Sequence, residues 1–262
     1  MTLSVVIITH NEEANLARTL ESVKPLVADG KGEIIVVDSG STDRTVEIAK
    51  SFGAKVFIEE WKGFAAQKNS AIDKAAGDWI LSLDADEELS AGLGEVIARA
   101  MGPDDDSAKI SGAWISRKNF FLGRWIRHGG FYPDRKLRLF RHGKGKFEER
   151  QVHETIRLEG KSYALDHSYD RWGSDISIIH HSYTTLSDYI EHMNRYSSLG
   201  AEMVVAKGKV RFSVINIVVR PLLTFIYNYF FRLGFLDGRE GLLLHLNHAV
   251  YVSWKYAKAW EL

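Results

Sequence analysis

Residues 79–87 read WILSLDADE, an apolar run that ends in two carboxylates, Asp84 and Asp86, spaced i, i+2. The run predicts a buried strand, whose alternating side chains put Asp84 and Asp86 on the same side wherever the extended geometry persists. Two carboxylates at the carboxyl end of a strand can hold a hard divalent cation that also carries phosphate oxygens. Ligands bind at that edge of an open α/β sheet, so the stretch is a candidate metal and diphosphate site. Acidic residues after a strand are also common turn formers and helix caps, and D-x-D alone is a weak pattern.

The length and composition of the chain argue against some classes of protein and of active site. The chain has 262 residues, long enough for one large domain or for one domain with a substantial extension. Lys+Arg and Asp+Glu number 34 each, and this balance argues against general nucleic-acid binding. The absence of cysteine excludes disulfides, thiolate nucleophiles and Cys-based zinc sites.

No targeting signal is expected at the N-terminus. The chain runs directly into strand-like Leu3–Ile8, with no basic region or long apolar segment before it. A cytoplasmic location for the main body is therefore the default expectation.

Strand and helix patterns alternate over about the first hundred residues and predict a parallel sheet with crossover helices. Expected strands are Leu3–Ile8, Glu33–Val37, Lys55–Ile58 and Trp79–Leu83. Expected helices carry the apolar face of Leu16, Leu20 and Val23, follow the loop 39–43 as far as Phe52, and cover Gln67–Ala76. Residues 114–141 lack clean periodicity and predict strands and long loops, whereas helical patterning returns at Leu186 and continues to the C-terminus.

Two further polar groups belong to the same edge of the predicted sheet. Asp38 and Asp84 both close parallel strands, and Thr9 to Glu12 follow the first strand. A carboxylate there can accept hydrogen bonds from ribose hydroxyls or from a base N–H. For Asp38, a role in the Asp-Ser-Gly-Ser turn is an equally good interpretation.

Several motifs, occurring in the same order along the chain, resemble those of the family 2 inverting glycosyltransferases, which have the GT-A fold. The segments are VVIITHNEEANL, IIVVDSGSTDRTVEIA, GFAAQKNSAIDKAAGDWILSLDADEEL and QVHETI. The resemblance spans about residues 1–183 and implies an α/β fold, with a mixed, mainly parallel sheet and flanking helices. It implies a GT-A domain over 1–185, with a nucleotide-binding half at about 1–103 and an acceptor half at about 104–185. Residues 186–262 would form a helical extension, a candidate for membrane association.

YPDRKLRLFR, VHE and the HHSY-to-RYS segment resemble a subgroup that adds sugars to the inner core of lipopolysaccharide or lipooligosaccharide, including beta-1,4-glucosyltransferases. The resemblance implies transfer of a sugar, glucose from UDP-glucose, to an inner-core acceptor. Another polysaccharide or lipid-linked acceptor is the alternative. The implied partners are a UDP-sugar donor and a lipid-linked oligosaccharide.

The resemblance also assigns roles to residues. Five would bind the nucleotide sugar: Thr9 and Glu12 beside the nucleotide, Asp38 at uracil or ribose, Lys68 at the base or diphosphate, and Asp84 at the ribose or sugar. Asp86 would ligate a Mg or Mn cation that bridges the diphosphate and neutralises charge on the leaving group. Lys68 stands where many relatives carry Arg.

The catalytic base is a choice between two acids. Such a base removes a proton from the acceptor hydroxyl as it attacks the anomeric carbon, and one in-line displacement inverts that carbon. By resemblance the base is Glu154, in Val-His-Glu, although the sequence alone favours a surface Glu near a strand end at this position. Asp134, in Tyr-Pro-Asp-Arg, is the alternative base, and Pro-Asp is also a common turn pair.

Two histidines are candidates for a third metal ligand, which GT-A enzymes often take from this region. His180 fits the His-x-x-Tyr spacing of the family better than His181 does. A lone His is more often structural or exposed to solvent, so metal ligation and a structural role remain open.

A basic cluster lies in the expected acceptor half. It comprises Arg135, Lys136, Arg138 and Arg141. The planar fork of Arg suits phosphate, so Arg135 and Arg138 are candidates for binding a phosphorylated core sugar, a nucleotide diphosphate or a lipid headgroup. A solvated strand face is the alternative.

Residues 210–234 are strongly apolar but are interrupted by Arg211, Arg220 and Arg232. A transmembrane helix needs about 20 predominantly apolar residues, so these charges favour an interfacial, basic amphipathic element. A helical pair packed on the catalytic domain, or a dimer interface, is the alternative. With a lipid-linked acceptor, we expect peripheral contact with the cytoplasmic face of the inner membrane.

Two other classes of protein compete with this interpretation. Haloacid-dehalogenase-like phosphatases place D-x-D after an apolar strand, but they usually carry Thr or Val where this chain has Glu88. A non-catalytic sugar-nucleotide-binding module is the second, and retention of Asp84, Asp86 and Glu154 argues against it. A dinucleotide oxidoreductase is disfavoured because the first strand-to-helix junction lacks G-x-G-x-x-G.

Overall fold

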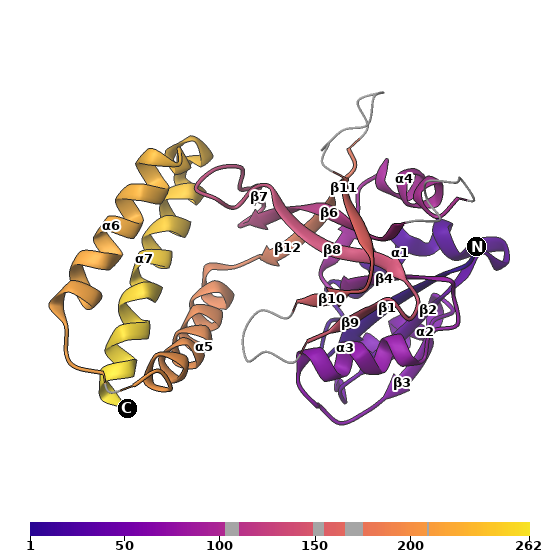
Figure 1. The fold of residues 1–262 in the computed structure, drawn as a ribbon, viewed down its shortest axis with the longest axis horizontal. Helices are drawn as coiled ribbons and strands as arrows, with labels where there is room; N and C mark the ends of the chain where they lie inside the picture. The colour runs from indigo at the N-terminus through magenta and orange to yellow at the C-terminus, as the bar shows by residue number, and fades with distance from the viewer. Residues whose placement is uncertain (103–109, 149–154, 166–174, 209) are drawn as a thin grey trace. The chain divides into compact units, whose positions relative to one another are not determined.

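The apolar runs of the first hundred residues form parallel strands, as predicted. The computed structural model describes residues 1–102, 110–148, 155–165, 175–208 and 210–262 (Figure 1). The first four strands are β1 (Leu3–Thr9), β2 (Gly32–Asp38), β3 (Lys55–Ile58) and β4 (Trp79–Asp84). β1 pairs in parallel with both β2 and β4, and β2 pairs in parallel with β3. The near-continuous burial of β1, β2 and β4 is typical of parallel strands covered by helices on both faces.

Helices connect these strands, as the periodicity predicts. They are α1 (Leu16–Val27), α2 (Thr45–Ser51) and α3 (Phe64–Asp73), and a further helix that was not predicted, α4 (Leu93–Ala100), follows the four strands. Leu16, Leu20 and Val23 are fully buried, which confirms the predicted apolar face of α1. α3 begins three residues before the predicted start, because Gly63 at φ 92° supplies a sharp backbone turn directly before Phe64.

The rest of the sheet is built from later, mostly non-local strands. These are β5 (Glu87–Leu89), β6 (Ile110–Phe121), β7 (Arg124–Trp125), β8 (Asp134–Arg141), β9 (Gly145–Phe147), β10 (Ile156–Leu158), β11 (Lys161–Leu165) and β12 (Ile178–Tyr183). The main strand order is β3-β2-β1-β4-β8-β6-β12-β5, while β9 and β10 form a separate pair. β8 runs antiparallel to β4, and β12 runs antiparallel to β5. The predicted α/β fold with a mixed, mainly parallel sheet is confirmed, and β4 lies between its parallel part and the later strands.

The chain divides into two compact units. The first comprises residues 1–117 and 135–180, and the second comprises 118–134 and 181–262. The predicted division assigns everything before residue 186 to one domain. The second unit instead combines residues 181–262 with residues 118–134 from the middle of the chain.

The second unit contains the long helices expected after Leu186. They are α5 (Leu186–Val205), α6 (Arg220–Ile226) and α7 (Gly238–Glu261), and π-helical turns at Ile215–Val219 and Tyr227–Phe231 extend α6 at both ends. α7 packs against both α5 and α6 (Figure 1). Among the described residues, no helix combines the length and apolarity needed to cross a bilayer.

Candidate active site

The loop after β2 is organised by Asp38. Its carboxylate accepts hydrogen bonds from Thr9 Oγ1 at 2.8 Å, from the backbone N–H groups of Gly40 and Ser41, and from Ser41 Oγ. Asp38 is fully buried, and the Thr9 bond ties the ends of β1 and β2 together. The turn role considered for Asp38 is therefore present, and the contact of Thr9 and Asp38 with a nucleotide stays a prediction.

Glu12 lies within electrostatic reach of both D-x-D carboxylates. Burial raises the pKa of Glu12, and the hydrogen bond from Asn15 lowers it. The negative charges of Asp86, Asp43 and Asp84 raise it further, and the net shift is upward. The sequence prediction that Glu12 and the D-x-D pair share one edge of the sheet agrees with this electrostatic coupling.

Asp84 at the end of β4 is held by two cations. Lys68 Nζ, from α3, lies 2.8 Å from Asp84 Oδ1, and an Arg138 guanidinium nitrogen, from β8, lies 2.5 Å from Asp84 Oδ2. Burial by itself would raise the pKa of Asp84, but the positive charges of Arg138 and Lys68 outweigh it and hold the pKa well below its usual range. The Asp84 side chain keeps 29% of its surface exposed, so an ionised carboxylate in a fixed position faces the edge of the sheet.

A third acid, Glu87, completes the cluster. Glu87 is fully buried, and its Oε1 binds Arg138 at 2.6 Å and Arg117 at 2.9 Å. Its Oε2 accepts the backbone N–H of Asp84 at 3.0 Å. Glu87 thus binds the backbone of Asp84 directly and binds its carboxylate through Arg138.

We name these five residues the ion-pair cluster: Lys68, Asp84, Glu87, Arg117 and Arg138. Three cations face two carboxylates, so the cluster carries a formal charge of +1. Sequence reasoning missed Glu87 and Arg117 as site residues. The position of Glu87, directly after D-x-D and before the apolar Leu89, was the available signal.

Asp86 has a different environment from Asp84. The extended geometry of β4 ends at Asp84, and Asp86 lies in the turn before β5. Its Oδ2 lies 3.1 Å from His180 Nε2, because β12 pairs with β5 and places His180 opposite Glu87. The ring of His181 instead stacks on Phe120, with centroids 5.6 Å apart. Of the two candidate histidines, His180 is therefore the one beside the D-x-D motif.

Asp86 and His180 form a pair and not a full coordination shell. The described part of the chain contains no group of three or more His, Cys, Asp or Glu side chains arranged to hold a metal ion. The carboxylate oxygen suits Mg²⁺ or Mn²⁺, whereas the imidazole nitrogen suits a softer ion than Mg²⁺, and substrate oxygens and water would have to supply the other positions.

Successive side chains of β8 point to opposite faces of the sheet, so the residues of the predicted basic cluster lie in different environments. Arg135 is exposed, whereas Arg138 is buried and bound to Asp84 and Glu87. Arg141 lies over the Trp79 ring at 4.7 Å. Arg138 thus belongs to the ion-pair cluster, and acceptor or phosphate binding by Arg135 and Arg138 stays a prediction.

Of the two candidates for the base, the structure describes Asp134 but not Glu154. Glu154 lies outside the described residues. Asp134 begins β8, and its Oδ2 accepts a hydrogen bond from Asn119 Nδ2 at 3.2 Å within the second unit. The choice between the two acids stays a prediction.

Comparisons with known proteins identify the family of the chain. Residues 4–157 match the model of glycosyl transferase family 2. The chain is 31% identical over 265 residues to the lipopolysaccharide core biosynthesis glycosyltransferase LpsC of Rhizobium meliloti, an alignment that covers 99% of this chain and 92% of LpsC. It is 30% identical over 279 residues to the uncharacterized glycosyltransferase RT0209 of Rickettsia typhi, covering 99% of this chain and 87% of that protein.

Among solved structures, the chain resembles S. aureus TarS 1-349. The TM-score is 0.51 at 16% sequence identity, with 98% of this chain and 90% of the TarS chain covered. This likeness supports the fold. The family model covers more than half of the chain and LpsC aligns over nearly all of it, so the chain belongs to glycosyl transferase family 2 and is a glycosyltransferase.

Proposed function

We propose that the protein is an inverting glycosyltransferase that moves glucose from UDP-glucose to an inner-core acceptor of lipopolysaccharide. The observation that carries this proposal is the D-x-D edge itself, where Asp84 is fixed in the ion-pair cluster and Asp86 lies beside His180. The similarity to LpsC over nearly the whole chain supports the choice of acceptor.

The ion-pair cluster would prepare the site for a nucleotide sugar. An ionised Asp84 accepts hydrogen bonds, so it suits the hydroxyl groups of a ribose or hexose. Lys68, Arg117 and Arg138 would bring cationic groups near an anionic diphosphate at this edge. Because Lys68 and Arg138 are already bound to carboxylates, the site is organised before the donor arrives and needs little rearrangement.

Asp86 and His180 would hold a divalent cation, Mg²⁺ or Mn²⁺. Their facing atoms, Asp86 Oδ2 and His180 Nε2, are 3.1 Å apart, close enough for one cation to contact both residues. When bound, the cation would act as a Lewis acid toward the diphosphate leaving group. Asp86 would have to exchange its contact with His180 for the cation.

A carboxylate base is the remaining requirement. We assign it to Glu154, with Asp134 as the alternative, to accept the proton of the acceptor hydroxyl as the oxygen attacks the anomeric carbon. The new C–O bond forms on the face opposite the departing UDP, which inverts the configuration of that carbon.

The acceptor determines where the enzyme works. An acceptor linked to lipid would place the protein on the cytoplasmic face of the inner membrane as a peripheral protein. Transfer to another polysaccharide or lipid-linked acceptor is the alternative, because the donor edge of the sheet carries no information about the acceptor. UDP binding without transfer to any acceptor would instead favour a non-catalytic sugar-nucleotide-binding module.

The direct test is product formation from defined substrates. The full chain is incubated with UDP-glucose, Mn²⁺ and truncated lipopolysaccharide cores, with UDP-galactose and UDP-N-acetylglucosamine as matched donors. We expect a mass increase of one hexose with UDP-glucose, and NMR of the product should show a β linkage from the α-configured donor. An α linkage would contradict inversion, and a mass increase only with another donor would contradict the assignment of glucose.

A further inference from the structure

The helical segment 214–231 exposes one continuous apolar face. Its large exposed side chains recur at spacings of three and four residues: Val214, Ile215, Val218, Val219, Leu222, Leu223, Tyr227, Phe230 and Phe231. Leu223 is 58% exposed and Phe231 is 76% exposed. A contiguous apolar stripe of this kind marks a surface that binds a partner, since single exposed apolar residues are normal but rows of them are not.

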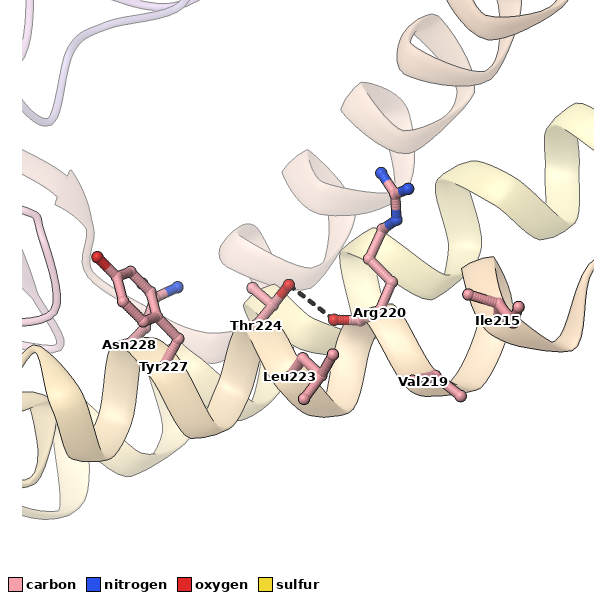
Figure 2. A pocket seen from close by; sticks show the side chains of 7 residues that line it. All are labelled: Ile215, Val219, Arg220, Leu223, Thr224, Tyr227 and Asn228. Carbon is pink, nitrogen blue, oxygen red and sulfur yellow. Dashed lines mark hydrogen bonds between the residues drawn. The ribbon is translucent and has the colours of Figure 1, made fainter.

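A groove with a volume of about 420 Å³ runs along this face (Figure 2). Ile215, Val219, Leu223 and Tyr227 provide most of its apolar lining. Arg220 is the only charged residue among the lining side chains, and it lies in the middle of the segment. The groove therefore combines apolar side chains with the polar Thr224 and Asn228 and a single cation, which complements an acyl chain attached to a polar, anionic headgroup.

The charges of this region all have the same sign. Residues 210–236 contain Arg211, Arg220 and Arg232 and no acidic residue. Arg220 donates a hydrogen bond to the Tyr256 hydroxyl at 2.8 Å and lies 5.0 Å from the centre of that ring. Within the described parts of the chain, no carboxylate forms an ion pair with Arg220. Its guanidinium keeps a net positive charge beside the apolar face.

We propose that the 214–231 face binds the surface of an anionic phospholipid bilayer, with Arg220 contacting a lipid phosphate. The apolar stripe would enter the boundary between headgroups and acyl chains, and the helix would lie in the plane of the membrane. Tyr227 is of a residue type enriched at this boundary, and Phe230 and Phe231 suit the apolar face of an interfacial helix. The inference deepens the proposed function, since peripheral contact with a membrane forms part of it, and it rests on no residue of the donor site.

A second copy of the chain is a poorer partner for this face. A two-fold dimer brings identical patches together, so each patch must complement itself. A patch whose only charges are arginines would bring like charges together in a dimer and offer them no carboxylate. An anionic lipid surface complements the same patch in both polarity and charge.

Flotation with vesicles tests this proposal on the purified full chain. One set of vesicles contains phosphatidylcholine alone, and the other contains phosphatidylglycerol as about one third of the lipid. We expect the chain to float with the anionic vesicles, to bind neutral vesicles much more weakly, and to lose affinity as the salt concentration rises.

Two variants and two matched controls locate the binding face. Leu223→Asp should weaken binding to anionic vesicles at least about ten-fold, because it places a carboxylate in the acyl boundary. Its control is Ile58→Asp, a change at a side chain that is 67% exposed on β3 of the first unit.

Arg220→Gln should weaken binding about five-fold, as expected for one surface cation near anionic lipid. Its control is Arg239→Gln, because Arg239 is paired with Glu240.

Circular dichroism and an unchanged thermal unfolding midpoint establish that each variant is folded. Equal flotation of Leu223→Asp and Ile58→Asp would overturn the proposal. It would also be overturned if the wild-type chain stayed off vesicles but formed a dimer by light scattering that Leu223→Asp dissociates, because the face would then join two copies. If the wild-type chain bound vesicles but not UDP, the membrane inference would stand and the proposed UDP-sugar donor would be rejected.

Discussion

Replacing Glu87 with alanine is expected to lower the free energy of unfolding by about 3–5 kcal/mol. The change removes a buried carboxylate that binds both Arg138 and Arg117, and it leaves these cations close together with less negative charge to offset them. It also leaves the backbone N–H of Asp84 without its acceptor. Urea unfolding monitored by circular dichroism measures the loss.

The neighbouring acid provides the matched control. Glu88 forms an ion pair with Arg18 at 3.6 Å, and both side chains are partly exposed. We expect Glu88→Ala to cost less than about 1 kcal/mol, because solvent screens an exposed pair. Equal losses in Glu87→Ala and Glu88→Ala would show that the cluster does not hold β5 against β4 and β8.

Glu154→Gln is expected to reduce kcat by about 10²–10⁴-fold, while the affinity for UDP-glucose stays within about two-fold of wild type. Gln keeps the size of Glu but cannot accept the proton of the attacking hydroxyl. The donor binds before any proton moves, so a base affects the chemical step alone. Initial rates of UDP release with acceptor, together with UDP titration, separate the two effects.

Asp134→Asn is the paired experiment, because Asp134 is the alternative base. If Glu154 is the base, Asp134→Asn should retain transfer within about ten-fold of wild type. Near-normal turnover in Glu154→Gln, with loss of turnover in Asp134→Asn, would transfer the role to Asp134. A KM effect alone in either variant would indicate substrate binding and not proton transfer.

The N-terminal half of the fold was predictable because its signals are local. Uninterrupted apolar runs between turn residues predict buried parallel strands, and Lys55–Ile58 matches β3 at both ends. The later strands were not predictable in detail. β8 pairs with β4 across more than fifty residues of intervening chain, and its alternating Arg and Leu pattern is compatible with a solvated strand face.

The site was predicted only in part, because some of its residues belong to short local motifs whereas others are brought in by pairing between distant strands. Asp84 and Asp86 follow from a short motif, and Lys68 and His180 from resemblance to the family. The partners of Asp84 depend on strand pairing. Arg138 was a candidate for binding a phosphorylated core sugar, a nucleotide diphosphate or a lipid headgroup, and its ion pair with Asp84 was not predictable because it depends on the antiparallel pairing of β8 with β4. Glu87 was not identified from the sequence, and its bonds to Arg117, Arg138 and the backbone N–H of Asp84 account for its burial.

The central claim is that the D-x-D edge binds a nucleotide diphosphate with a divalent cation held by Asp86 and His180. Calorimetric titration of UDP into the full chain, first with Mn²⁺ and then with excess chelator, tests it most directly. We predict binding with Mn²⁺ that weakens at least about ten-fold on chelation, and loss of this difference in Asp86→Ala. Equal affinity with and without the cation, or no binding of UDP in either condition, would contradict the account.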